Sequence, residues 1–241
     1  MNPRVLVIQN EESAPANMVG EWLEECGLVL DVIHAYAGED IPAHVPSDYA
    51  GVLAFGGAMG ANDDSDFRWL TAERQLLADA AHNDVPTFGI CLGAQVLATA
   101  IGGTSTRADV IEIGAYEFDV LDVARNDSVF ATLAGSTVKA AQWHQDWIAT
   151  LPTQAVVLAS NDNCPVQAFR FGNNVYGVQF HPEVDAASFK EWYNVADEAA
   201  DRSGIDMVVA VDQVRESESE MIATWRPVFH AWAEVVKQRQ E

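Results

Sequence analysis

Cys91 has the sequence surroundings of a reactive thiol, since it stands between Gly89 and Gly93. A short apolar run over residues 85–90 precedes it, and a helix-like run over residues 92–101 follows it. A strand-to-helix turn at such a position is sharp, and small neighbours allow the backbone to make it. The sulfur then lies at a helix N-terminus, where backbone N–H groups and the helix dipole favour the thiolate. The pattern predicts that Cys91 is a nucleophile.

A nucleophilic cysteine needs an imidazole to carry the proton and a third group to orient that imidazole. His181 follows an apolar run over residues 175–180, which places it at the end of a predicted strand. Open α/β proteins build their sites at that edge of the sheet. Glu183 lies two residues further on, and Pro182 stiffens the link, so the carboxylate can reach the imidazole. Four other histidines are expected to be structural or solvated, namely His34, His44, His82 and His230.

The first half of the chain alternates between strand and helix patterns. Strands are predicted over residues 5–9, 29–34, 51–55 and 85–90. Helices are predicted over residues 16–26, 67–82 and 92–101. This alternation predicts an α/β fold with an open, mostly parallel central sheet and helices on both faces.

The second half is richer in strands, so an added antiparallel region is expected. Strands are predicted over residues 109–123, 138–143 and 155–159, with a hairpin formed by residues 165–171 and 175–180. A last helix over residues 216–237 has apolar residues along one face. That face is expected to pack on its own domain, with an oligomer contact as the alternative, and Pro227 is expected to kink the helix. We therefore predict one domain over residues 1–190 and a helical C-terminal extension over residues 191–241 packed on it.

Composition excludes some classes of partner. The formal net charge is −23, with 13 Lys and Arg against 36 Asp and Glu, so neither nucleic acid nor an anionic membrane is an expected partner. Neither an apolar run long enough to span a bilayer nor a signal-peptide pattern is present, and a cytoplasmic location is expected. Three scattered cysteines form neither a disulfide framework nor a zinc motif. Cys26 and Cys164 are expected to be inert.

Two motifs together carry a family resemblance. Gly-Ile-Cys-Leu-Gly-Ala-Gln at residues 89–95, followed by Gln-Phe-His-Pro-Glu at residues 179–183, resembles the class I (triad-type) glutamine amidotransferases. The loop over residues 55–60 is similar to the oxyanion loop of that family. Residues 143–146 resemble a substrate-side segment of the GMP synthase branch, and the chain is similar to stand-alone members related to it. Gln145 departs from the family pattern, in which glycine is frequent there.

The resemblance implies a role for each matching residue. Cys91 would be the nucleophile, His181 the general base and then acid, and Glu183 the orienting carboxylate. The backbone N–H groups of Gly57 and Leu92 would form the oxyanion hole. The substrate would be held by Gln95 and by backbone groups of Trp143, Gln145 and Asp146. His144 is expected to be a partner for a loop carbonyl or a carboxylate. Neither a metal nor an organic cofactor is required.

The implied reaction is hydrolysis of the γ-amide of glutamine, or of a γ-glutamyl compound, through a γ-glutamyl thioester. The sequence contains no Ser-Gly-Gly-x-Asp-Ser loop and no P-loop, so this chain is not expected to adenylate an acceptor. Three hypotheses stay open. A stand-alone γ-glutamyl hydrolase is favoured slightly over a glutaminase subunit that feeds ammonia to a separate synthetase. A non-catalytic binding or regulatory protein is the third.

Overall fold

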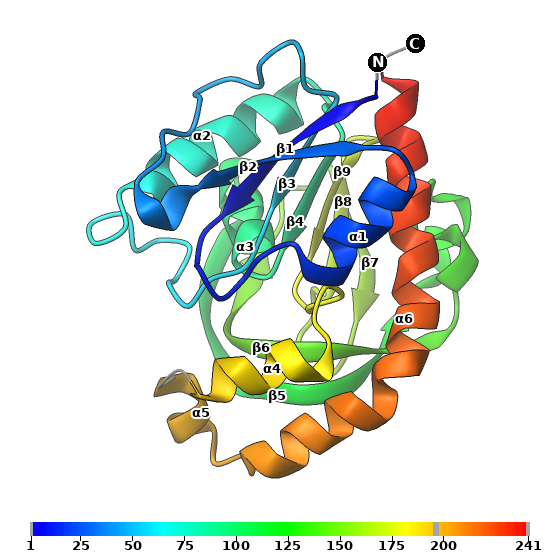
Figure 1. The fold of residues 1–241 in the computed structure, drawn as a ribbon. Helices are drawn as coiled ribbons and strands as arrows, with labels where there is room; N and C mark the ends of the chain where they lie inside the picture. The colour runs from blue at the N-terminus through cyan, green and yellow to red at the C-terminus, as the bar shows by residue number, and fades with distance from the viewer. Residues whose placement is uncertain (1, 195–197, 240–241) are drawn as a thin grey trace.

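The computed structural model describes residues 2–194 and 198–239 and contains a nine-stranded sheet flanked by helices (Figure 1). The strands follow the order β2-β1-β3-β4-β9-β8-β7-β5-β6. The pairs from β2 to β9 are parallel, and those from β9 to β6 are antiparallel. The α/β prediction is therefore confirmed, and the expected antiparallel region is continuous with the parallel one.

The parallel half of the sheet is covered on both faces. Its strands are β1 (Arg4–Gln9), β2 (Val29–His34), β3 (Gly51–Ala54), β4 (Thr87–Ile90) and β9 (Val175–Val178). Along β1, Val5 and Val7 enter one apolar cluster, which also contains residues of α1 (Asn17–Glu25) and α6 (Met207–Gln238). Leu6 and Ile8 enter a second cluster, which contains residues of α2 (Trp69–His82) and α3 (Leu92–Ala100). This alternation follows from the two-residue period of a strand and accounts for its continuous apolar sequence.

The antiparallel half consists of β5 (Thr104–Val120), β6 (Thr137–Thr150), β7 (Ala155–Ser160) and β8 (Ala168–Phe171). The predicted hairpin is confirmed, because β8 pairs with β9 across a turn in which Phe171 opposes Val175. β5 and β6 are longer than predicted, and Figure 1 shows them curving beneath the rest of the sheet. Their pairing shifts register between Arg107 and Glu112. Such bulges bend a strand and re-aim its side chains.

The helices are α1 (Asn17–Glu25), α2 (Trp69–His82), α3 (Leu92–Ala100), α4 (Ala186–Asn194), α5 (Glu198–Ser203) and α6 (Met207–Gln238). Short 3-10 turns cover Ala35–Ala37, Asp122–Asn126 and Ala131–Leu133. Among the described residues, no helix combines the length and the apolar composition needed to cross a membrane.

The C-terminal helix α6 begins at Met207, nine residues before the predicted start at residue 216. The side chain of Asp206 caps it by accepting hydrogen bonds from Val208 N and Val209 N at 3.0 and 3.4 Å. The prediction missed this first part because residues 207–211, Met-Val-Val-Ala-Val, form a continuous apolar run in which no helical period can be distinguished. The helix continues through Pro227 and runs up the side of the sheet beside α1 (Figure 1). A kink at Pro227 stays a prediction.

Trp225 anchors α6 to the antiparallel part of the sheet. It is buried, its ring lies 4.4 Å from that of Phe180, and its Nε1 donates to the Lys139 carbonyl at 3.0 Å. We expect Trp225→Ala to lower the free energy of unfolding by about 3–5 kcal/mol, since it leaves a cavity and an orphaned carbonyl. Trp225→Phe keeps most of the packing and should cost about 1–2 kcal/mol. Urea unfolding of both variants measures the difference, and equal losses would contradict the packing argument.

Candidate active site

Cys91 lies on the sharp turn that joins β4 to α3. Its φ angle is 49°, a left-handed value that few residues other than glycine adopt. The turn is held from both sides, because Cys91 N donates to the Val178 carbonyl at 2.8 Å and Gln95 N donates to the Cys91 carbonyl at 3.0 Å. A strained conformation of this kind persists only where its surroundings fix it, and it is frequent at functional sites.

The two flanking glycines are required by close backbone contacts. A Cβ atom on Gly89 would lie 2.7 Å from Ala94 N. A Cβ atom on Gly93 would lie 2.2 Å from the Ala54 carbonyl oxygen, so α3 could not pack against β3. The spacing of Gly89, Cys91 and Gly93 in the sequence therefore reflects the space available at the turn.

The structure brings the three predicted catalytic residues together. His181 Nδ1 lies 2.8 Å from Glu183 Oε1. A Cβ atom placed on Gly56 would be 3.1 Å from His181 Cε1 and 3.7 Å from Cys91 Cβ, so the side chains of His181 and Cys91 border the same point of the predicted oxyanion loop. Burial lowers the pKa of His181, but the charges of Glu183 and Cys91 outweigh this effect and raise it to about 10.

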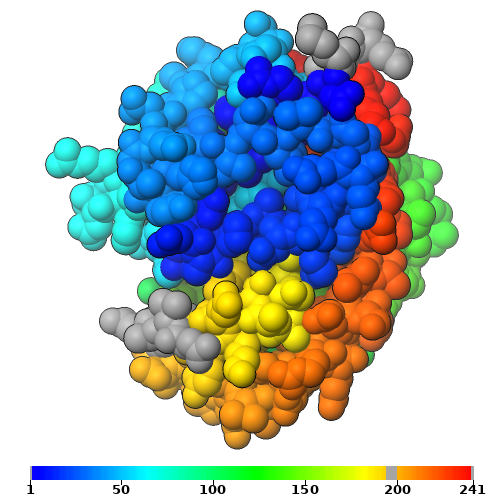
Figure 2. Space-filling model, in the orientation of Figure 1, coloured from blue at the N-terminus to red at the C-terminus, as the bar shows by residue number. Residues whose placement is uncertain are grey.

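The position of His181 is further fixed by Trp192, which the sequence analysis did not identify. The two rings meet edge to face with centroids 4.7 Å apart, and His181 N donates to the Ala141 carbonyl at 2.8 Å. Trp192 Nε1 donates to the Ser13 carbonyl at 2.7 Å, which ties α4 to the N-terminal segment. Figure 2 shows these two parts of the chain in contact on one face of the molecule. The only sequence signal was a helical aromatic spacing, Phe189 to Trp192.

The two predicted oxyanion donors are neighbours. A Cβ atom on Gly57 would lie 3.0 Å from Leu92 Cδ2, so the backbone of Gly57 lies beside the residue that follows Cys91. The loop is held in place by Asn10, whose Nδ2 donates to the Phe55 carbonyl at 3.1 Å. Gly57 and Leu92 are therefore neighbours, and the role of their N–H groups as an oxyanion hole stays a prediction.

The buried carboxyl group of Glu73 supports this loop through Asn10. Glu73 Oε1 accepts a hydrogen bond from Asn10 Nδ2 at 3.1 Å, while Glu73 Oε2 has no hydrogen-bond partner among the described residues. Burial raises the pKa of Glu73 from 4.5 to about 7. The sequence analysis missed Glu73 because it lies within an amphipathic helix pattern, far from Asn10 in the chain.

This pKa predicts a pH-dependent stability. The folded protein binds the Glu73 proton more tightly than the unfolded chain does, so this group lowers stability progressively as the pH rises from about 4.5 to about 7. We expect Glu73→Gln to remove the effect, so that the variant gains up to ~3 kcal/mol relative to wild type over this range. Urea unfolding of both proteins between about pH 4.5 and 8 measures the gain. A difference that stays constant with pH would contradict the prediction.

The predicted substrate-side residues lie on β6. The Trp143 carbonyl oxygen is 3.9 Å from Cys91 Sγ, and the Trp143 ring packs against Phe189 and Trp192. The Gln145 side chain points toward α5, where its Oε1 accepts a hydrogen bond from Arg202. This contact gives a local reason for glutamine at a position where the family often has glycine.

The side chain of Gln95 contacts the same segment of β6 and is hydrogen-bonded to other residues of the protein. Its Nε2 donates to the Asp146 carbonyl at 3.1 Å and to Gln179 Oε1 at 3.2 Å. The Asp146 carboxylate forms an ion pair with Arg107 at 3.2 Å, and burial, the largest of several effects, raises its pKa. Gln95 therefore connects α3 to the segment that borders Cys91, as well as lying one turn from the nucleophile.

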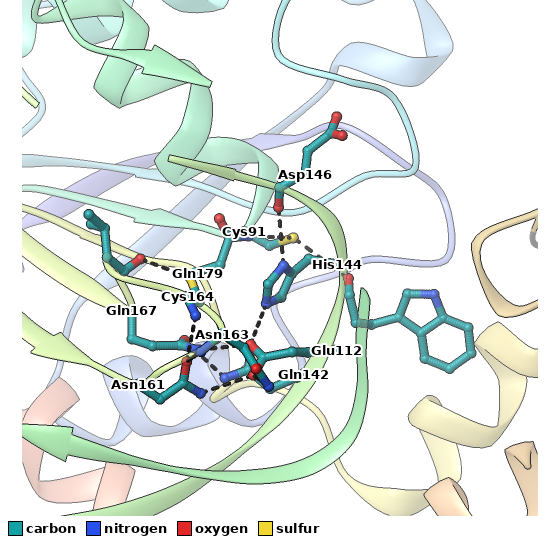
Figure 3. A network of polar contacts seen from close by, with 12 residues as sticks. Cys91, Glu112, Gln142, His144, Asp146, Asn161, Asn163, Cys164, Gln167 and Gln179 are labelled. Atoms are coloured by element: carbon teal, nitrogen blue, oxygen red, sulfur yellow. Dashed lines mark hydrogen bonds and ion pairs between the residues drawn. The ribbon is translucent and has the colours of Figure 1, made fainter. Parts of the chain in front are cut away.

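His144 is buried and belongs to a polar network (Figure 3). Its ring nitrogens contact the Asp146 carbonyl at 3.1 Å and Glu112 Oε2 at 3.0 Å, which confirms the expectation of a carbonyl or carboxylate partner. The network includes residues that the sequence analysis did not identify, namely Glu112, Gln142, Asn161, Asn163 and Gln167. They come from strands and loops distant in sequence, so no local pattern signals them.

The described residues contain one group with the donors for a metal, formed by Glu112, His144 and Cys164, whose ligand atoms lie within 4.8 Å of one another. The Glu112 carboxylate accepts hydrogen bonds from three amide side chains in addition to its contact with His144. Burial raises the pKa of Cys164 to about 12, so its thiol keeps the proton that a metal ligand would lose. The arrangement fits a hydrogen-bonded network better than a metal site.

These features define a class of protein, the open α/β proteins with a cysteine, histidine and glutamate at the carboxyl edge of the sheet. The family model for "Glutamine amidotransferase class-I" matches residues 6–194. The chain belongs to this family.

Individual relatives agree with this assignment. A glutamine amidotransferase-like protein of Salmonella typhimurium is 28% identical over 219 residues, which cover 89% of this chain and 90% of that protein. A glutamine-hydrolysing GMP synthase component of Pyrococcus abyssi is 33% identical over 147 residues, which cover 61% of this chain and 71% of that protein. A crystal structure of a glutamine amidotransferase from Thermotoga maritima matches with a TM-score of 0.84 at 26% identity, and the match covers 97% of this chain and 99% of that chain. Alignments with the corresponding GMP synthase components of several other organisms span about half of their length.

Proposed function

We propose that this protein hydrolyses the γ-amide of glutamine, or of a γ-glutamyl compound, through a thioester on Cys91. The observation that carries the proposal is the geometry around His181, whose Nδ1 lies 2.8 Å from Glu183 Oε1 and whose ring borders the same point at Gly56 as the side chain of Cys91. An imidazolium held between a thiolate and a carboxylate is the arrangement that a cysteine nucleophile requires. The raised pKa of His181 supports this protonated state at neutral pH.

In the proposed first half-reaction, Cys91 Sγ attacks the γ-carbonyl carbon of the substrate. The backbone N–H groups of Leu92 and Gly57 stabilise the developing oxyanion. Because His181 Nδ1 is bound to Glu183, Nε2 is left to give its proton to the departing amine. The carbon–nitrogen bond breaks, ammonia or an amine leaves, and a γ-glutamyl thioester stays on the sulfur.

In the proposed second half-reaction, the neutral imidazole of His181 takes a proton from water, which attacks the thioester carbonyl. The same two N–H groups hold the second oxyanion. The carbon–sulfur bond breaks, glutamate leaves, and the thiolate and imidazolium are restored. Glu183 keeps the orientation of the ring through both steps.

The amino-acid end of the substrate is assigned to backbone groups of Trp143, Gln145 and Asp146, together with Gln95. Support comes from the Trp143 carbonyl, 3.9 Å from Cys91 Sγ, and from the hydrogen bond that joins Gln95 to the Asp146 carbonyl. Carbonyl oxygens and the nearby Asp146 carboxylate suit an ammonium group, which has donors and no acceptors.

Two physiological settings fit this chemistry. A stand-alone hydrolase is favoured by the relative in Salmonella typhimurium, which this chain matches over 90% of that protein's length, and by the inclusion of α6 in the same apolar cluster as the sheet. A glutaminase subunit that supplies ammonia to a separate synthetase is the second candidate, since several relatives are named as single subunits of a GMP synthase.

The test is release of ammonia and glutamate by the purified protein from glutamine and a panel of γ-glutamyl amides and peptides. We expect turnover of at least one substrate by the protein alone, with Cys26→Ala as a control that retains it. Turnover that occurs only after addition of a purified synthetase would favour the role of a glutaminase subunit. Absence of turnover under both conditions would reject the hydrolytic function.

A further inference from the structure

Glu112 is a fully buried carboxylate to which the proposed reaction assigns no role. Its oxygens accept hydrogen bonds from Asn161, Asn163 and Gln167 at 2.9, 3.3 and 3.0 Å, and Oε2 also contacts His144 Nε2 at 3.0 Å. Burial alone would raise its pKa, but the contact with His144 and the amide donors lower it. Since a buried charge is costly unless it is paired and hydrogen-bonded, this group is a charged anchor within the fold.

The ring of His144 joins two elements through its two nitrogens. A carbonyl oxygen only accepts hydrogen bonds, so His144 Nδ1 donates to the Asp146 carbonyl at 3.1 Å. Nε2 contacts Glu112 Oε2 at 3.0 Å. His144 therefore links a buried carboxyl group on β5 to a backbone carbonyl on β6.

A continuous path of hydrogen bonds leads from this pair through Asp146, Gln95 and Gln179 to the nucleophile. The Asp146 carbonyl also accepts from Gln95 Nε2, which in turn binds Gln179 Oε1. Gln179 Nε2 then donates to Cys91 Sγ at 3.6 Å. The pair thus holds the backbone of residues 143–146 against α3 and against the residue that follows β9.

The strand pairing shows why this support is needed. Glu112 and His144 are directly opposed on β5 and β6, immediately after the register shift that begins at Arg107. Regular backbone pairing is interrupted there, next to the stretch of β6 that borders Cys91. The side-chain bonds of Glu112 and His144 replace part of the support that the interrupted ladder does not give.

We propose that Glu112 and His144 are positioning residues, which set the backbone of residues 143–146 at the distance from Cys91 that the substrate requires. This inference rests on the proposed function, in which that backbone holds the amino-acid end of glutamine. Neither side chain touches the reacting atoms. Their loss should therefore weaken binding of the substrate more than it slows the chemistry.

The test compares Glu112→Gln with Asn163→Ala, which removes the longest hydrogen bond to the same carboxylate and leaves the contact with His144 intact. We expect Glu112→Gln to raise KM for the hydrolysed substrate by about 10- to 100-fold, with kcat changed by less than about threefold. Asn163→Ala should leave KM within about threefold of wild type. The melting temperature of each variant shows whether the two are comparably stable.

Alkylation of Cys91 by iodoacetamide tests the reactivity of the thiol separately, because this reagent does not bind the subsite for the amino-acid end of the substrate. The rate of alkylation should be the same in wild type and Glu112→Gln. Equal KM values for Glu112→Gln and wild type, or a loss of alkylation parallel to the loss of activity, would overturn the positioning role. A wild-type protein that is alkylated at Cys91 but hydrolyses no γ-glutamyl substrate would instead reject the proposed function, and the positioning role with it.

Discussion

Replacing Cys91 with alanine is expected to lower the rate of γ-amide hydrolysis by at least ~10⁴-fold, because no other group can form the thioester. The backbone of the turn is held by Val178 and Gln95 through main-chain hydrogen bonds that the substitution keeps. The variant should therefore fold and still bind substrate. Steady-state release of ammonia measures the loss, and circular dichroism confirms the fold.

The other two cysteines provide matched controls for this result. Cys164 is buried beside Glu112, and Cys26 is the C-cap residue of α1. We expect Cys164→Ala and Cys26→Ala to retain activity within about threefold of wild type. Comparable losses in all three variants would show that the cysteines act through stability rather than through a nucleophile.

The second large effect is expected for Gly93→Ala. The added methyl group would lie 2.2 Å from the carbonyl oxygen of Ala54, and both atoms belong to rigid elements. Either α3 moves away from β3 or the protein is destabilised, at a cost of about 3 kcal/mol or more. A shift of about 1 Å in Cys91 would lower hydrolysis by roughly 100-fold. Urea unfolding and ammonia release measure the two effects.

Gly27→Ala is the matched control for this substitution. Gly27 has a φ of 83°, and a Cβ atom there would meet nothing within 4 Å. Only the backbone conformation is penalised, by about 1 kcal/mol, and activity should be unchanged. If Gly93→Ala were as mild as this control, the close contact between α3 and β3 would not be what positions the nucleophile.

Local patterns predicted the parts of this protein that depend on neighbours in the chain. The buried strands around Cys91 are short apolar runs, and the glycines of the turn stand at fixed positions beside the nucleophile. His181 and Glu183 are two residues apart, so their contact is a property of one short segment. These features could be predicted because sequence spacing determines their geometry.

Features that depend on long-range packing could not be predicted in this way. Glu112 meets its partners on β6 and in the segment between β7 and β8, and none of them lies near it in the sequence. Trp192 acts on His181 only because α4 folds back over the site. The bulge after Arg107 depends on how β5 pairs with β6, and no turn signal in the sequence marks it.

The most direct test of the central claim is the reaction of Cys91 with 6-diazo-5-oxo-norleucine. This glutamine analogue alkylates a protein nucleophile that lies next to the position of the substrate's γ-carbonyl group. We predict one covalent adduct per chain, located on Cys91 by peptide mass spectrometry, blocked by excess glutamine and absent from Cys91→Ala. No adduct on a folded protein, or an adduct on Cys26 or Cys164 instead, would contradict the assignment of Cys91 as the nucleophile.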